Sequence, residues 1–217
     1  MKVSLADYIL PRLVTKLGWC VTTEYRYFRR AQRLENKQCV VISIYSPSGG
    51  GKTTIVHALA ERMPNAKALY FDDRNYDSDS GITDICQWYD EGADVNRFDL
   101  RLLASDIEQC MKEGFAYVFL DYPFGHRHEL TSKHLDLSIF IDTPLDIAFA
   151  RRLRRDYADK TAREILEEAD FYLQKGRSVY LHGSKTARID AGMVADGSLT
   201  VDEIVSEISD KLTQLKA

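Results

Sequence analysis

The stretch Ser46-Pro47-Ser48-Gly49-Gly50-Gly51-Lys52-Thr53-Thr54 decides the fold of this chain. The apolar run from Cys39 to Tyr45 that precedes it is typical of a strand buried in a parallel sheet. After it, Ile55, Leu59 and Met63 share one face of a helix. A strand, a glycine-rich turn and a helix in this order predict a loop that binds phosphate groups.

The residue types in this loop suit phosphate binding. Three consecutive glycines leave backbone N–H groups open to phosphate oxygens, and the start of the helix adds partial positive charge. We expect Lys52 to reach the β- and γ-phosphates of ATP and the Thr53 hydroxyl to bind Mg²⁺. Ser46 stands where the usual pattern begins with glycine, while Gly51-Lys52-Thr53 is intact. The residues predicted to bind the nucleotide are Ser48, Gly49, Gly50, Gly51, Lys52, Thr53 and Thr54.

Composition narrows the class of protein. The 217 residues and 45% hydrophobic content predict one α/β domain with a sizeable core. A net charge of -4 argues against a nucleic-acid-binding face. No apolar stretch approaches the ~18 residues of a membrane span. Four scattered cysteines without metal or disulfide spacing favour a reducing, cytoplasmic location. We expect neither nucleic acid nor membrane as a partner, and the sequence leaves the oligomeric state open.

Residues 1–38 precede the first strand, and we expect them to form a helical extension to a domain of residues 39–217. Leu5, Ile9, Leu13 and Leu17 form an apolar stripe, which Pro11 is expected to interrupt. A second helix is predicted from about Thr23 to Asn36. Its arginines are expected to form a solvated face, with an acidic partner as the alternative.

Two aspartates follow the second predicted strand. Ala66 to Phe71 is expected to be this strand, and Asp72 and Asp73 come directly after it. Open α/β sheets bind ligands at the carboxyl ends of their strands. One of these carboxylates can therefore accept the proton of a hydroxyl that attacks a γ-phosphate. Two aspartates that merely stabilise a turn are the alternative.

The segment from Asp72 to Asp99 is strongly acidic. It contains nine acidic and two basic residues, a net charge of -7. Trp88, Tyr89 and Phe98 are interleaved with these charges. The pattern favours either an acceptor pocket with aromatic walls, suited to a polyhydroxylated or cationic molecule, or a solvated acidic loop with aromatic residues packed beneath it.

A third strand is predicted from Ala116 to Leu120, and the acid that closes it is Asp121. An apolar strand that ends in a carboxylate downstream of a phosphate loop is typical of a residue that helps to hold Mg²⁺. His126 and His128 follow, and we interpret them as surface polar groups because no third metal ligand lies nearby in the sequence.

The fourth strand, Leu137 to Ile141, leads into a helix for which Thr143 is the predicted N-cap. On this helix Arg151 and Arg155 are spaced i, i+4 and face outward together. Arginines presented in this way can bind phosphate oxygens and stabilise charge on a transferring phosphoryl group. A solvated, ion-paired helix face is the alternative.

The remaining elements complete an α/β sheet. Thr161-x-x-Glu164 and Thr200-x-x-Glu203 are capping boxes that predict the starts of two further helices. A fifth strand is expected from Arg188 to Ala195. The last helix is predicted to close the sheet.

Taken together, the chain resembles uridine kinase-like P-loop kinases, relatives of nucleoside and small-metabolite kinases, from about Val40 to Leu212. The motifs that carry the resemblance are Ser48 to Thr54, Asp73-x-x-Tyr76, and Asp136 to Thr143 running into Ala150-Arg151-Arg152-x-x-Arg155-Asp156. The third strand departs from the family, because it ends in Asp121-Tyr122-Pro123 where uridine kinases commonly have Glu-Gly.

The resemblance implies a P-loop NTPase fold with three layers, a five-stranded parallel sheet and helices on both faces. It implies that Asp73 is the general base, with Asp72 as the rival, and that Arg151 and Arg155 belong to a lid at about residues 151–180. The implied function is transfer of the γ-phosphoryl group of ATP to a hydroxyl of a nucleoside- or sugar-like small molecule. The alternatives are a nucleotide-dependent regulatory ATPase or switch, and an antibiotic-modifying phosphotransferase.

Overall fold

The computed structural model describes residues 37–72, 76 and 81–216. Residues 1–36, which contain both helices predicted for the extension, lie outside the described residues, and so does Asp73. Within the described ranges, no helix combines the length and the hydrophobicity needed to cross a membrane.

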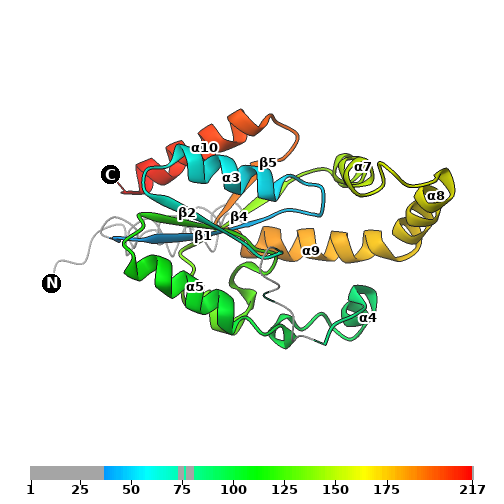
Figure 1. The fold of residues 1–217 in the computed structure, drawn as a ribbon, viewed down its shortest axis with the longest axis horizontal. Helices are drawn as coiled ribbons and strands as arrows, with labels where there is room; N and C mark the ends of the chain where they lie inside the picture. Colours follow the sequence, from blue (N-terminus) through cyan, green and yellow to red (C-terminus); the bar gives the residue numbers. More distant parts are fainter. Residues whose placement is uncertain (1–36, 73–75, 77–80, 217) are drawn as a thin grey trace, which may run out of the picture.

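A five-stranded parallel sheet forms the centre of the molecule, as predicted (Figure 1). Its strand order is β2-β3-β1-β4-β5, so the first strand lies in the middle. Val41, Ile42 and Ile44 of this strand are fully buried, which explains its largely apolar sequence. The strands are β1 (Val40–Tyr45), β2 (Ala66–Tyr70), β3 (Tyr117–Asp121), β4 (Leu137–Asp142) and β5 (Met193–Asp196).

Helices cover both faces of the sheet and make three layers. Figure 1 shows α3 and α10 on one face and α5 and α9 on the other. The principal α-helices are α3 (Lys52–Arg62), α4 (Ile85–Asp90), α5 (Arg101–Lys112), α7 (Leu145–Asp156), α8 (Ala162–Phe171), α9 (Arg177–Asp190) and α10 (Val201–Lys216). Shorter helical turns are η1 (Val95–Arg97), η2 (Gly125–Arg127), α6 (Glu129–Ser132) and the π-helical η3 (Tyr172–Gly176).

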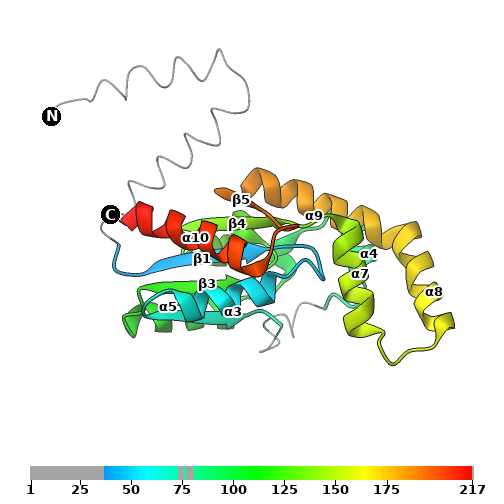
Figure 2. The same cartoon turned by 90° about the horizontal axis from the view of Figure 1, so that it is seen from above.

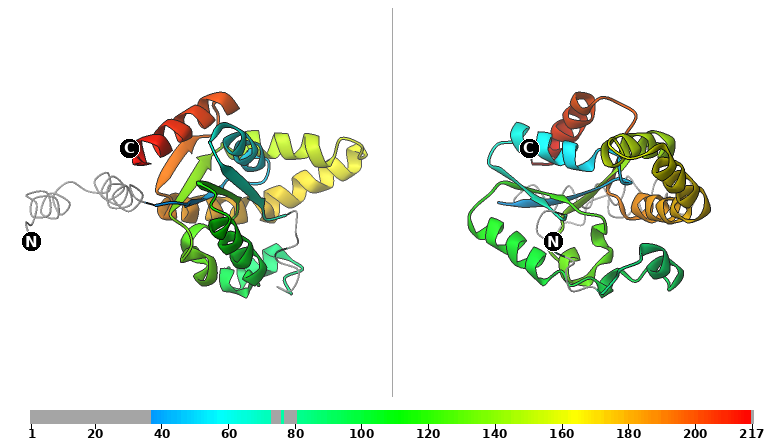
Figure 3. Two further views of the ribbon diagram at one scale, coloured as in Figure 1. Left: turned by 60° about the vertical axis from the view of Figure 1, so that its left-hand side comes forward. Right: turned by 45° about the vertical axis from the view of Figure 1, so that its right-hand side comes forward.

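Each face of the sheet has its own hydrophobic core. Ile55 and Leu59 of α3 pack with Ile208 of α10 over one face. On the other face, Leu103 and Ile107 of α5 pack in a second cluster that also includes the α4–η1 segment. Figure 3 shows α4 on this same side of the sheet. The strand ends near the phosphate loop are thereby held between two packed layers.

The fifth strand is shorter than predicted. Residues Arg188 to Asp190 belong to the end of α9, and β5 begins only at Met193. Ala187 and Ala191 are buried while Ile189 is 54% exposed, and this i, i+4 spacing follows a helix rather than a strand. The expectation of a strand from Arg188 was therefore wrong in its first half.

The helices α7, α8 and α9 form an arm that extends beyond the carboxyl edge of the sheet (Figure 2). The capping box of Thr161 and Glu164 is present at the start of α8, as predicted. The chain then continues through η3 into α9 without leaving a helical conformation. Leu173 of the π-turn is 71% exposed, whereas its neighbour Tyr172 is buried.

Two contacts hold the arm in shape. Arg152 of α7 pairs with Glu168 of α8, and both side chains are largely buried. The ring of Tyr172 stacks on Phe149 with centroids 4.1 Å apart. Arg152 therefore has a structural role in the arm, distinct from that of the exposed arginines of the same helix.

Candidate nucleotide and phosphoryl-transfer site

The loop between β1 and α3 packs directly against the arm through a glycine. Gly49 has a φ of +84°, a conformation that strains other residues. A Cβ atom at this position would lie 2.1 Å from the carbonyl oxygen of Ala148 in α7. Only glycine therefore allows this contact between the loop and α7.

Ser46, which departs from the usual glycine of the motif, packs against Gly50. The serine side chain is buried, and a Cβ atom on Gly50 would lie 1.7 Å from the serine Oγ. The hydroxyl thus occupies the space that a side chain at position 50 would need. The N–H of Gly50 also donates to the carbonyl of Pro47 at 2.7 Å, which closes the turn.

Thr143 supports the same loop from β4. Its buried hydroxyl donates to the carbonyl of Gly50 at 2.8 Å, and Gly197 approaches it so closely that a Cβ there would lie 2.0 Å away. Thr143 was predicted to cap the following helix, but the N-cap position is Pro144 and α7 begins at Leu145. The prediction was wrong because a loop distant in sequence supplies a better acceptor for the hydroxyl.

Asp121 brings the predicted phosphate and magnesium residues together. It is the last residue of β3, and its side chain is only 4% exposed. Its Oδ1 lies 3.3 Å from Nζ of Lys52, and its Oδ2 accepts a hydrogen bond from the Thr53 hydroxyl at 2.5 Å. A buried carboxylate therefore fixes both side chains at the start of α3.

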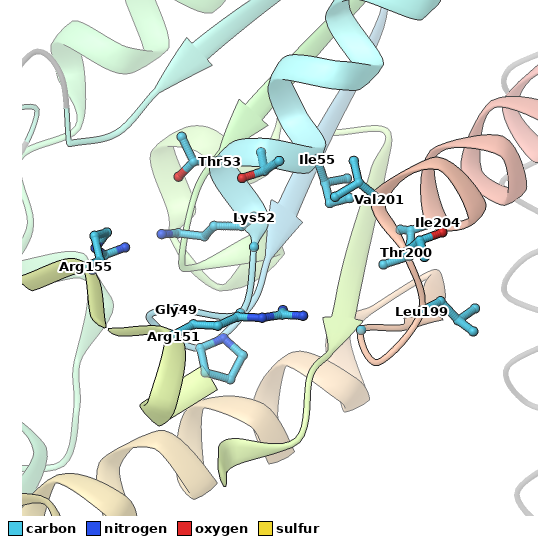
Figure 4. Close-up of a pocket in the computed structure, with 15 residues that line it drawn as sticks. Gly49, Lys52, Thr53, Ile55, Arg151, Arg155, Leu199, Thr200, Val201 and Ile204 are labelled. Carbon is cyan, nitrogen blue, oxygen red and sulfur yellow. The ribbon is translucent and has the colours of Figure 1, made fainter. Parts of the chain in front are cut away.

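A cavity of about 480 Å³ lies over this loop (Figure 4). The loop, Lys52 and Thr53 form its floor, and Arg151 and Arg155 of α7 line it from the arm. Figure 4 shows Arg151 extending toward the turn that precedes α10. The structure thus collects residues from three separate segments around one space.

The turn after β5 forms another wall of the cavity, which the sequence analysis did not identify. Its residues are Gly197, Leu199, Thr200, Val201 and Ile204. Leu199 and Val201 are each 40% exposed, so apolar surface is open to a ligand here. The only signal in the sequence was the Asp196-Gly197-Ser198 turn, which shows that a loop is present but not which residues face the nucleotide.

Arg155 of α7 reaches the phosphate loop. Its guanidinium donates to Asp156 and, at 3.4 Å, to the hydroxyl of Ser48. The hydrogen bond that Arg155 donates to Asp156 is the main cause that raises the pKa of Arg155, and the carboxylate of Asp72 adds to the effect. Asp72, which is exposed, is therefore close enough to act on Arg155, while Asp73 lies outside the described residues.

The described acids between α4 and α5 act within their own segment. Asp84 caps α4 and Asp94 caps η1. Glu91 pairs with Arg97, and Asp99 pairs with the arginine at the start of α5. These four carboxylates therefore give no support to the expectation of a cationic acceptor.

Two of the three aromatic residues in this segment belong to the core. Trp88 and Phe98 are buried and meet edge to face with centroids 5.8 Å apart. Tyr89 remains partly open and contacts His182 of α9 at 5.2 Å. The alternative of aromatic residues packed beneath an acidic loop thus describes the first two, and only Tyr89 contacts the arm.

The loop histidines also differ from their interpretation as surface groups. His128 is 4% exposed, and its Nε2 lies 3.0 Å from the carbonyl oxygen of Phe98, so it joins two loops of the core. Within the described part of the chain, no group of three or more His, Cys, Asp or Glu side chains is arranged to hold a metal ion. The expectation that Thr53 and Asp121 help to hold Mg²⁺ stays a prediction, and the two side chains are hydrogen-bonded to each other.

Comparison with known proteins places this geometry in context. No family model matches the sequence. The chain is 29% identical over 168 residues to the uridine kinase of Borrelia hermsii, which covers 64% of this chain and 78% of the relative. It is 27% identical over 155 residues to the uridine kinase of Psychromonas ingrahamii, with 58% and 73% covered.

The fold has solved counterparts. A gluconokinase from Sinorhizobium meliloti aligns with a TM-score of 0.50 and 17% identity over 82% of this chain and 93% of that one. At this identity the match shows the fold alone. The chain is therefore a distant homologue of uridine kinases, and its fold is that of P-loop small-molecule kinases.

Proposed function

We propose that this protein is an ATP-dependent kinase that transfers the γ-phosphoryl group to a hydroxyl of a small molecule. The observation that carries the proposal is the arrangement of Lys52, Thr53 and Asp121 beneath one cavity that Arg151 and Arg155 line from the arm. A regulatory ATPase has no need of two arginines opposite its phosphate loop, and its relatives here are uridine kinases. The proposal includes a kinase domain of residues 39–217, a lid at about 151–180 and a separate extension of residues 1–38.

The residues of this chain would divide the work as follows. Backbone N–H groups from Ser48 to Thr54 hold the phosphates, and Lys52 offsets their charge. Arg151 and Arg155 bind oxygens of the transferring group, where negative charge develops. The acceptor hydroxyl loses its proton to an aspartate after β2, for which Asp73 is our choice and Asp72 the rival.

The donor atoms at the loop fit a Mg²⁺ ion. Oxygen is the ligand that Mg²⁺ prefers, and Thr53 offers a hydroxyl while Asp121 offers a carboxylate. Oδ1 of Asp121 is buried and accepts no hydrogen bond from any described residue, and its nearest cation is Nζ of Lys52 at 3.3 Å, so a metal shell would have to approach it beside that lysine. When bound, the ion would neutralise charge on the β- and γ-phosphates.

The first test replaces Lys52 with alanine. Purified protein is incubated with γ-labelled ATP and a panel of nucleosides, sugars and sugar acids, and labelled products are separated. We expect the wild type to label at least one acceptor. The rate of phosphoryl transfer by Lys52→Ala should be at least about 100-fold lower. The melting temperature without nucleotide is expected to fall as well, because the buried carboxylate of Asp121 loses its cation, so transfer is measured well below the melting temperature of the variant.

Two outcomes would count against the proposal. ATP hydrolysis that no acceptor stimulates, with no labelled product, would favour the regulatory ATPase. Unchanged transfer in Lys52→Ala would show that the loop does not bind the donor. Arg62→Ala, on the outer face of α3 where it donates to Ser206, is the matched control and should transfer like the wild type.

A further inference from the structure

Arg127 is a half-buried cation that forms no ion pair with an acid in the part of the chain that the structure describes. It is half-buried at the end of η2, the turn that follows β3. Nε donates to the carbonyl of Phe124 at 3.2 Å and Nη2 to the carbonyl of Pro123 at 3.3 Å. No Asp or Glu among the described residues forms an ion pair with it. Two carbonyls satisfy part of a guanidinium that has five donors and leave its charge uncompensated.

The backbone that carries Arg127 is firmly held. The N–H of His126 donates to Oδ2 of Asp190 at 2.7 Å, and Gly125 approaches the same carboxylate so closely that a Cβ would lie 2.2 Å from it. Asp190 is the last residue of α9. The turn is therefore tied to the helix that forms one side of the arm, and the arginine is presented from a rigid support.

Arg127 lies at the carboxyl edge of the sheet, the edge at which open α/β sheets bind ligands. Pro123, one of its acceptors, is two residues beyond Asp121, and Tyr45 is the last residue before the phosphate loop. Burial raises the pKa of Tyr45 to about 12, and Arg127 acts against this rise, which indicates that the two side chains are near one another. The Tyr45 hydroxyl in turn lies against Gly183 of α9, where a Cβ would be 2.4 Å from it.

Asp190 lies against the same turn but accepts from the N–H of His126, and among the described residues it forms no ion pair with Arg127. The described acids of the neighbouring segment cap their own helices or pair with their own arginines, as shown above. Lys52, Arg151 and Arg155 face the phosphate loop and its cavity instead. Arg127 is thus a fixed positive charge that the nucleotide site does not use.

We propose that Arg127 binds an anionic group of the phosphate acceptor, so that the acceptor is a hydroxy acid or a phosphorylated alcohol rather than a neutral or cationic one. The unpaired, half-buried guanidinium at the carboxyl edge of β3 carries this inference. A guanidinium matches both carboxylate and phosphate, because each offers two oxygens to its planar fork. The inference rests on the proposed kinase function, since it names the acceptor class of that site.

The test compares acids with their neutral counterparts. Protein saturated with a non-hydrolysable ATP analogue is titrated with gluconate and glucose, with ribose 5-phosphate and ribose, and with uridine 5′-monophosphate and uridine, and binding is followed by melting temperature and calorimetry. We expect the wild type to bind at least one acid at least about 10-fold more tightly than its neutral partner. The pair that shows the preference distinguishes carboxylate from phosphate.

The variants locate the preference at Arg127. Arg127→Met should remove the acid preference, Arg127→Lys should keep part of it, and Arg62→Met should leave it unchanged. The ratio of acid to neutral affinity within one variant is the decisive value, because a general loss of stability does not alter it. Wild type that binds no acid better than its neutral partner, or Arg127→Met that keeps the preference, would overturn the inference.

The two proposals fail separately. Labelled product from a neutral alcohol alone would support the kinase and overturn the role of Arg127. An acid that binds through Arg127 but never receives a phosphoryl group would uphold the binding site and remove the kinase.

Discussion

The donor side and the acceptor side of the cleft are built in different ways. On the donor side, nine consecutive residues supply most of the groups expected to hold the triphosphate, and Thr143, Asp121 and α7 only brace them. On the acceptor side, the candidates come from the ends of separate elements: Asp72 and Asp73 after β2, Arg127 after β3, and Tyr89 of α4 against α9. A local motif can be identified in a sequence, whereas a surface assembled from distant loops cannot.

Substitution of the proposed general base, on the acceptor side, is expected to have the largest effect. Asp73→Asn should lower phosphoryl transfer by about 10²- to 10⁴-fold, because an amide cannot accept the proton of the attacking hydroxyl. The Kd for ATP should change little. Initial rates and calorimetry on the same preparations measure both quantities.

Asp72→Asn is the matched control, since it removes the neighbouring carboxylate. If Asp72→Asn has the larger effect on transfer, Asp72 is the base and the choice made by resemblance is wrong. Equal losses of transfer and ATP binding in Asp73→Asn would indicate a role in metal binding or folding instead.

The contact of the phosphate loop with the arm should be sensitive to a single methyl group. Gly49→Ala places Cβ against the carbonyl of Ala148 and should cost about 1–3 kcal/mol from overpacking, in addition to the strain of a positive φ. Urea unfolding measures the loss, and the Kd for ATP should rise with it. The loop and α7 are thereby tested as one unit.

Gly114→Ala is the control that separates the cost of backbone strain from the cost of steric overlap. Gly114 has a φ of +81°, but a Cβ there meets no atom within 4 Å, so only the strain remains. Equal losses of unfolding free energy in Gly49→Ala and Gly114→Ala would show that the loop does not pack against α7 as described.

The smallest effect is expected at Thr143. Thr143→Val removes the hydrogen bond to the carbonyl of Gly50 and should lower the free energy of unfolding by about 1–3 kcal/mol, since a buried acceptor loses its donor. Nucleotide affinity should fall along with it, because the loop is less well held. Thr213→Val, which removes a hydroxyl that donates within α10, should leave nucleotide affinity unchanged.

Much of the fold could be predicted because its signals are local. Cys39 to Tyr45 and Leu137 to Ile141 are apolar except for one serine each, and such runs are the pattern of strands buried on both faces. The two capping boxes each satisfy backbone groups within four residues, and both occur in the structure. The secondary structure of Arg188 to Ala195 was harder to predict, because a short apolar run is compatible with a helix as well as with a strand.

The candidate site shows the same difference between residues with local sequence signals and residues brought together by packing. Lys52, Thr53 and Asp121 could be named in advance because a strand end and a helix start determine where their side chains lie. The residues that support the loop and form the other wall of the cavity could not be named in this way. Thr143 was predicted to cap its own helix, and Leu199 and Val201 were not identified. Their roles depend on which loops meet at the carboxyl edge of the sheet, and no spacing within one segment reports this.

The sequence by itself determined that the chain folds as a parallel α/β domain and presents a phosphate-binding loop, because hydrophobic periodicity and glycine geometry act over a few residues. Only the tertiary structure decided that Ser46 packs on Gly50, that α7 rests on Gly49, and that Arg127 donates to two carbonyls rather than to an acid of the described residues. Those facts depend on residues up to about a hundred positions apart, and the balance of burial and charge between them exists only once the elements have packed.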